Sequence, residues 1–128
     1  MKLVLGITLP LLYLVLTSCE GGTTFTKKVN NQSGDTLIVA TYSVYASDKP
    51  VTIPPGTSKE VFWHDQLGGF VDDSYSCTDE LDSLLISTSG GKSLLTDPMD
   101  ENNWSRQSRD GRNSREDCTF TVTDEDLQ

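Results

Sequence analysis

The strongest strand signal of the chain lies at residues 36–45, which read Thr36-Leu37-Ile38-Val39-Ala40-Thr41-Tyr42-Ser43-Val44-Tyr45. β-Branched and aromatic residues, which favour extended backbone, dominate this stretch. Apolar side chains fall on both faces of such a strand, with Leu37 and Val39 on one face and Ile38 on the other. A strand that is apolar on both faces belongs in the middle of a sheet. The stretch therefore predicts a central strand.

Shorter strand patterns flank this stretch on both sides, at residues 25–29, 50–53, 59–64, 84–88, 92–95 and 118–123. The first of them carries Lys27 and Lys28, which is typical of an edge strand. Pro55-Gly56 favours a type II turn, and Asp110-Gly111 favours a tight hairpin. Residues 92–95 are expected to form a hairpin with 84–88, and the acidic tail after residue 123 is expected to fray.

These patterns together predict an all-β fold without a long helix. About seven short strands with a turn signal roughly every ten residues are typical of an antiparallel β-sandwich. We expect an immunoglobulin-like or jelly-roll-like arrangement over residues 25–128. The length allows one domain.

The N-terminal segment has the layout of a cleaved secretory signal. Residues 3–16 are almost wholly apolar, follow Lys2 and lead into small residues before Cys19. The run is shorter than the ~20 residues that a spanning helix needs. Leu16-Thr17-Ser18-Cys19 resembles the lipobox of bacterial lipoproteins, in which an aliphatic residue and two small residues precede a cysteine. An ordinary secretory signal with a cysteine near its cleavage site is the alternative.

The resemblance implies removal of residues 1–18 and lipidation of Cys19 by palmitate-type acyl chains. Residues 19–24 would then be a lipidated tether, in which five residues reach at most ~17 Å. The protein would lie in the bacterial cell envelope with the membrane as its first partner, and Glu20 after the cysteine favours the outer membrane. The body also resembles other small bacterial lipoproteins with a Pro-Pro-Gly turn and an acidic tail, such as Pro54-Pro55-Gly56 and residues 124–128 here.

The charge of the chain restricts its partners. The mature part holds nine Lys and Arg (ten less Lys2) against nineteen Asp and Glu, a net charge of −10. This charge argues against nucleic acid, and against anionic lipid as a general partner.

Cys77 and Cys118 remain once Cys19 is lipidated. In an oxidising compartment a disulfide is expected, and closing a loop of this length stabilises the fold by about 4 kcal/mol. Two buried thiols are the alternative. No metal is expected on this pair, because His64 is the only histidine and no third soft ligand exists.

No catalytic constellation or cofactor motif is evident, and we expect no enzyme activity. His64 has no G-x-S-x-G partner serine. The 87–93 segment ends like a phosphate-binding loop, but Ile86 stands where that loop needs glycine. The acidic segment between Asp72 and Asp82 is either a calcium loop or a solvated loop paired with arginines.

Four arginines recur every third residue near the predicted hairpin turn, at Arg106, Arg109, Arg112 and Arg115. In a two-residue hairpin Arg109 would face Arg112, and Arg106 would face Arg115. Because like charges directly opposite are unfavourable, internal carboxylates such as Glu116 or an external anion should offset them. Such an anion would be a sugar acid or a lipopolysaccharide phosphate. Trp104 either stacks on this ligand or anchors the loop by packing.

The sequence therefore suggests a non-catalytic binding or accessory module held at the membrane. Its candidate ligand-binding residues are Trp104, Arg106, Arg109, Arg112 and Arg115, with an envelope protein or an anionic glycan as partner. The alternative is a structural or assembly subunit of an envelope complex, whose partner covers an exposed sheet edge.

Overall fold

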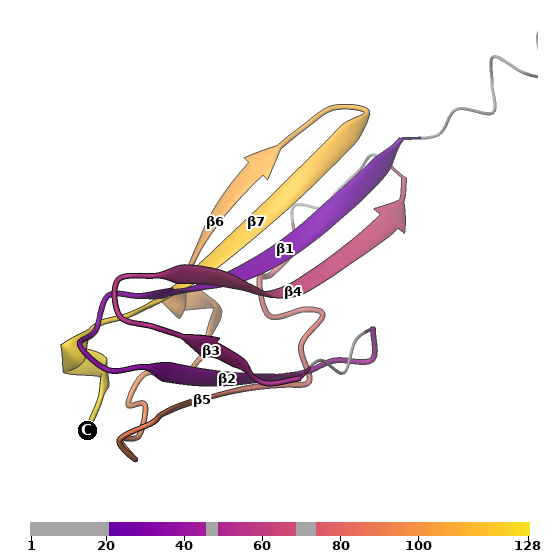
Figure 1. Ribbon diagram of the computed structural model, residues 1–128. Coiled ribbons are helices and arrows are strands. Elements are labelled where there is room, and N and C mark those ends of the chain that lie inside the picture. The colour runs from indigo at the N-terminus through magenta and orange to yellow at the C-terminus, as the bar shows by residue number, and fades with distance from the viewer. Residues whose placement is uncertain (1–20, 46–48, 69–73) are drawn as a thin grey trace, which may run out of the picture.

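The computed structural model describes residues 21–45, 49–68 and 74–128 (Figure 1). The predicted signal segment, Cys19, Asp72 and Asp73 lie outside the described residues. The seven strands are β1 (Gly22–Asn31), β2 (Leu37–Tyr42), β3 (Val51–Ile53), β4 (Ser58–Leu67), β5 (Ser83–Thr88), β6 (Trp104–Arg109) and β7 (Asn113–Val122). Two short 3-10 helices, η1 (Glu101–Asn103) and η2 (Asp124–Asp126), complete the elements. None of the helices in the described part is long and apolar enough to cross a membrane.

The strands form two packed sheets, and the predicted all-β sandwich of seven strands is confirmed. Sheet A has four strands in the order β4-β1-β7-β6, and sheet B has three in the order β3-β2-β5. Among the described strands, β1 and β7 pair in parallel, whereas the other four pairs are antiparallel. The first and last strands of the domain therefore lie side by side at the centre of sheet A.

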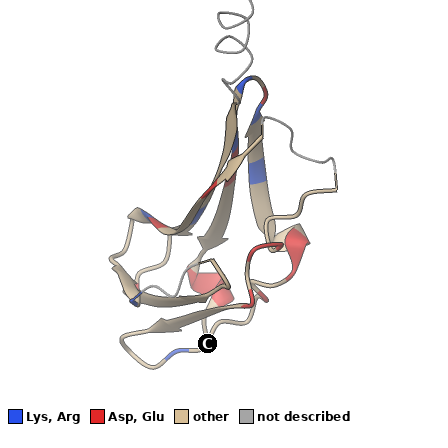
Figure 2. Cartoon of the chain, turned by 90° about the vertical axis from the view of Figure 1, so that its right-hand side faces the viewer, with Lys and Arg blue, Asp and Glu red and all other residues tan. Residues whose placement is uncertain are grey.

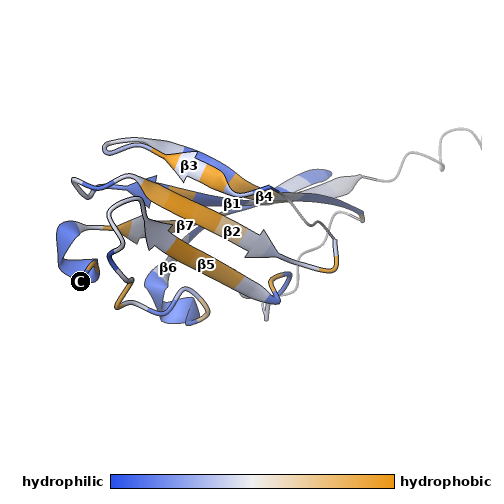
Figure 3. Cartoon of the chain, turned by 60° about the horizontal axis from the view of Figure 1, so that its bottom comes forward, coloured by the Kyte–Doolittle hydropathy of each residue, from blue (hydrophilic) through white to orange (hydrophobic). Residues whose placement is uncertain are grey.

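Strand β2 lies at the centre of sheet B, as predicted from residues 36–45. Leu37 and Val39 are buried in the core with Ile53, Phe62 and Phe120. The other face of β2 is not covered along its whole length, since Tyr42 at its end is exposed. Figure 3 shows the apolar residues concentrated along β2 and β5. Sheet B thus contributes one packed face and one open face.

The prediction of an edge strand at residues 25–29 is wrong. Strand β1 lies between β4 and β7, and the side chain of Lys27 is fully buried. The lysine is tolerated there because Glu80 neutralises it from a loop that covers this part of sheet A. Strand β1 also begins at Gly22, so part of the predicted tether belongs to the sheet.

Residues 92–95 do not form the predicted hairpin with residues 84–88, since only Ser87 and Ser93 form a bridge. They pair instead with the C-terminal residues, through Ser93 N to Gln128 O at 2.8 Å and Leu95 N to Asp126 O at 2.8 Å. The predicted fraying of the tail is therefore wrong as well, because these bonds and η2 hold it.

Candidate functional site

The largest concentration of buried charge lies on sheet A, beneath residues 74–82. Lys27 Nζ lies 2.5 Å from Glu80 Oε2 and donates to Cys77 O at 2.5 Å. It also donates to Tyr75 Oη at 3.1 Å, and Tyr75 in turn donates to Glu80 Oε2 at 3.1 Å. Every hydrogen-bonding group at the lysine is thus directed to a partner within the protein.

A second ion pair lies on the other side of Tyr75. Arg106 Nε donates to Glu116 Oε2 at 2.7 Å, and Ser108 Oγ donates to the same oxygen at 2.6 Å. Arg106 also donates to Tyr75 O at 2.7 Å, with its guanidinium 4.9 Å from the centre of the tyrosine ring. We call Lys27, Tyr75, Glu80, Arg106 and Glu116 the buried ion-pair cluster.

The electrostatics of this cluster follow from its burial. Burial lowers the pKa of Lys27 below its usual range, and the hydrogen bond to Glu80 offsets this only in part. Burial, and then the charge of Glu80, raises the pKa of Tyr75 far above its usual range. No described buried side-chain nitrogen or oxygen lacks a hydrogen-bond partner. The buried polar atoms of the cluster therefore all have partners within the fold.

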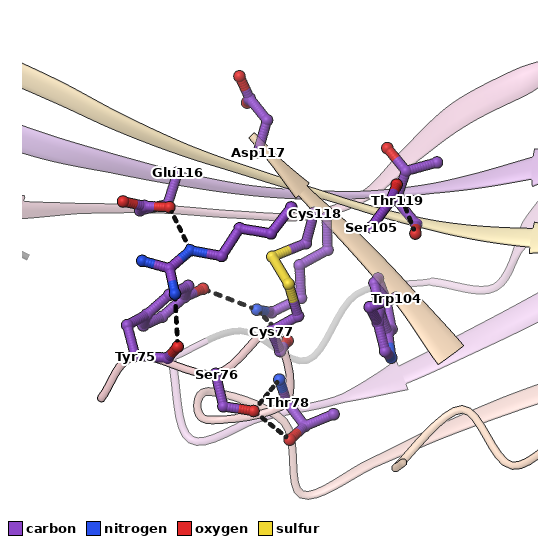
Figure 4. The surroundings of a disulfide bond; sticks show 12 residues. Tyr75, Ser76, Cys77, Thr78, Trp104, Ser105, Glu116, Asp117, Cys118 and Thr119 are labelled. Atoms are coloured by element: carbon purple, nitrogen blue, oxygen red, sulfur yellow. Dashed lines mark hydrogen bonds and ion pairs between the residues drawn. A yellow bond between two sulfur atoms is a disulfide. The ribbon is translucent and has the colours of Figure 1, made fainter. Parts of the chain in front are cut away.

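A disulfide between Cys77 and Cys118 joins residues 74–82 to β7, with a Cα–Cα distance of 5.8 Å. The predicted pairing is confirmed. Figure 4 shows the bond next to Tyr75, Glu116 and Trp104. The disulfide thus fixes the loop over the buried ion-pair cluster, where sheet B no longer covers sheet A.

The hairpin of β6 and β7 forms where Asp110-Gly111 predicts it, and Gly111 has a φ of 134°. Its register differs from the predicted one, because Arg109 lies opposite Arg115 and Arg106 lies opposite Cys118. Residues 110–114 lie between the paired positions, so the turn is longer than the predicted two-residue turn, and Asn113 and Ser114 pair only with β1 on the other edge of β7.

The expected internal neutralisation of the arginines is observed at two positions. Glu116 holds Arg106, and Asp117 accepts a bond from Arg115 Nε at 2.8 Å. Partial burial of Asp117 acts to raise its pKa, but the hydrogen bonds from Thr26 and Arg115 together outweigh this effect, so the pKa falls below the usual range. Arg109 and Arg112 are exposed near the turn.

Trp104 does not present its ring to solvent. The side chain is 8% exposed and packs against Phe120 in a tilted arrangement, with the ring centroids 5.4 Å apart. Its indole nitrogen donates to Pro98 O at 2.7 Å. Trp104 therefore packs as a loop anchor, which was one of the two alternatives, and its role in ligand binding stays a prediction.

The acidic segment is engaged in local structure where it is described. Asp79 accepts from Ser76 N at 2.9 Å, and Glu80 belongs to the buried ion-pair cluster. No group of three or more potential metal ligands occurs within residues 21–45, 49–68 and 74–128. His64 packs against the ring of Tyr45, with centroids 4.3 Å apart.

An open apolar surface lies on sheet B and the adjoining residues 92–98, and no motif in the sequence predicts it. Tyr42, Leu85 and Leu95 are 50%, 58% and 60% exposed. A groove of about 460 Å³ runs between β5 and residues 92–98 and includes Leu85 and Leu95 in its lining. The apolar run Leu84-Leu85-Ile86 is the sequence feature that could have predicted this surface. The same run is equally typical of a strand that is buried on both faces.

No family model, no curated protein and no solved structure matches this chain. Its function has to be argued from its own residues.

Proposed function

We propose that this protein is a lipid-anchored, non-catalytic accessory module of the bacterial cell envelope, which binds an envelope protein through sheet B. The lipobox-like sequence at Cys19 supports the anchor. The observation that carries the binding role is the open edge of β5 together with the adjoining groove.

Strand β5 can accept an additional strand. In the described part of the chain, β5 pairs with β2 along one edge, and its other edge forms only the bridge from Ser87 to Ser93. Backbone groups from Leu84 to Ile86 therefore border the groove without a neighbouring strand. An extended peptide segment can bind such an edge by backbone hydrogen bonds, while its apolar side chains contact Leu85 and Leu95.

The charge of the module favours a basic partner segment. The mature chain has a net charge of −10, from nine basic and nineteen acidic residues after removal of Lys2. An anionic glycan bound by the arginines is the weaker proposal, because Arg106 and Arg115 are already engaged in ion pairs.

Site-specific photo-crosslinking in the native membrane tests this function. A photoreactive amino acid at position 85 should give one protein adduct of one-to-one stoichiometry. The same group at Thr121, an exposed position on sheet A, should give none. Leu95→Glu should abolish the adduct, and Cys19→Ala should reduce it by releasing the module from the membrane. Equal labelling from positions 85 and 121 would contradict the proposed binding surface.

A further inference from the structure

The backbone at Gly21, just before β1, lies close to two turns of the domain. Gly21 O accepts a hydrogen bond from Gly68 N at 2.9 Å, directly after the end of β4. A Cβ atom on Gly21 would overlap the carbonyl group of Arg112, so the backbone here lies against the turn between β6 and β7. Figure 2 shows this turn, with its basic residues, at the end of the molecule away from the C-terminus. We call Gly21, Gly22, Leu67, Gly68 and residues 109–113 the tether end.

The proposed lipid anchor lies very near the tether end. Cys19 precedes Gly22 by three residues, which span at most about 11 Å even when fully extended. An acylated Cys19 sits at the membrane surface, so the tether end must lie at or close to the depth of the lipid headgroups. Gly68 and the Arg112 carbonyl also constrain the path of the chain at Gly21.

The chemistry of the tether end suits a phospholipid surface. Arg109 and Arg112 are exposed there on either side of Asp110, so positive charge is in excess in the turn, and guanidinium groups bind phosphate oxygens in a bidentate manner. Leu67 is 82% exposed and lies opposite Gly22 in the pairing of β4 with β1. The opposite end of the molecule holds the acidic η1 and η2 (Figure 2). The net negative charge is therefore unevenly distributed, and the basic turn lies at the membrane side.

We infer that the tether end forms a second, non-covalent contact with the bilayer, in which Arg109 and Arg112 bind lipid phosphates and Leu67 inserts among the headgroups. This inference rests on the proposed lipid anchor. The contact would hold the domain upright, with sheet B and its groove directed away from the membrane toward a partner.

Depth-dependent fluorescence quenching tests the contact with the full-length, lipidated protein. The protein is reconstituted in vesicles of phosphatidylcholine and phosphatidylglycerol that carry a spin-labelled headgroup lipid. A bimane label on Leu67→Cys should lose most of its fluorescence. The same label on Ser89→Cys, in the exposed turn after β5, should keep it. Equal fluorescence at both positions would overturn the inference.

A charge-reversal pair identifies the role of the arginines. Arg109→Glu with Arg112→Glu should largely remove the quenching at position 67. Lys49→Glu with Lys59→Glu changes the net charge by the same amount at two exposed lysines outside the tether end and should leave the quenching intact. Equal effects of the two double variants would contradict a specific role for the arginines.

Acylation of Cys19 is measured separately, by the mass of the Cys19 peptide, and attachment to the membrane is measured by flotation with the vesicles. An acylated, floating protein without quenching at position 67 would overturn the membrane contact alone. An unmodified Cys19 would overturn the proposed anchor and, with it, the contact.

Discussion

Lys27 lies in a different position in the fold from the one that its sequence pattern predicts. In the sequence it shares one face of the predicted strand with Phe25 and Val29, and together with Lys28 it is typical of an edge strand. In the structure it is fully buried, and its carboxylate partner Glu80 comes from a distant loop. No local pattern pairs these two residues, so their contact could not have been predicted from the sequence.

We expect Glu80→Gln to lower the free energy of unfolding by about 3 kcal/mol or more, because it leaves a buried ammonium group without its counter-charge. The matched control is Lys92→Met, which breaks the exposed pair with Asp35 and should lower the free energy of unfolding far less, because solvent screens an exposed ion pair. Urea denaturation of both variants measures the difference. Similar losses would show that the cluster is not the buried, low-dielectric site described here.

The two tryptophans provide a second comparison of single residues. Trp104→Ala removes a packed ring from the core and should cost about 3–5 kcal/mol. Trp63→Ala removes an exposed ring from β4 and should change stability by about 0.5 kcal/mol. Thermal unfolding of the two variants tests this order. A Trp104→Ala protein as stable as the native protein would instead favour ligand contact as the role of the ring.

At the scale of elements, the segment from residues 74 to 82 packs on sheet A although it contains no strand. It covers the part of sheet A that sheet B does not reach, and Cys77 ties it to β7. The sequence predicted the disulfide from compartment and cysteine number. It did not predict that the bond holds a loop over buried charges, since that depends on the unequal length of the two sheets.

We expect Cys77→Ala with Cys118→Ala to lower the free energy of unfolding by about 4 kcal/mol. The loop should also lift from sheet A, which exposes Lys27 to amine-acylating reagents. Urea denaturation and mass spectrometry of the modified lysines measure the two effects. The double variant should be insensitive to added reductant, whereas reduction of the native protein should reproduce its properties.

The C-terminal helix η2 gives a pH-dependent prediction. The hydrogen bond from Thr96 to Asp126, assisted by bonds from Thr123 and opposed by partial burial, lowers the pKa of Asp126. The carboxylate therefore stabilises the fold above the unfolded pKa of about 4, and this contribution is lost as the pH falls through the lower pKa of the folded state. Asp126→Asn should cost about 1 kcal/mol at neutral pH.

Urea denaturation across the acid range checks this prediction, since the difference between Asp126→Asn and the native protein should close as the pH falls. Glu125→Gln is the control, because Glu125 is an exposed neighbour in the same helix. A difference that stays constant into the acid range would assign the effect of Asp126 to its shape rather than to its charge.

At the scale of the molecule, local sequence patterns predict the sandwich, but they do not predict the two surfaces proposed to bind. The strand at residues 36–45, the turns at Gly56 and Gly111 and the final strand were all readable from residue alternation and turn chemistry. The parallel pairing of β1 with β7 and the free edge of β5 depend on which strands meet in space. The two surfaces proposed to act, the groove on sheet B and the tether end, both arise from that assembly.

The proposed location of the protein and its proposed orientation both depend on the state of Cys19, because the lipid anchor would set them. The decisive measurement is the mass of the mature N-terminus, from protein extracted with detergent out of bacterial membranes. We predict a chain that begins at Cys19 and carries acyl groups. A mature chain that begins elsewhere, or an unmodified Cys19, would contradict the account.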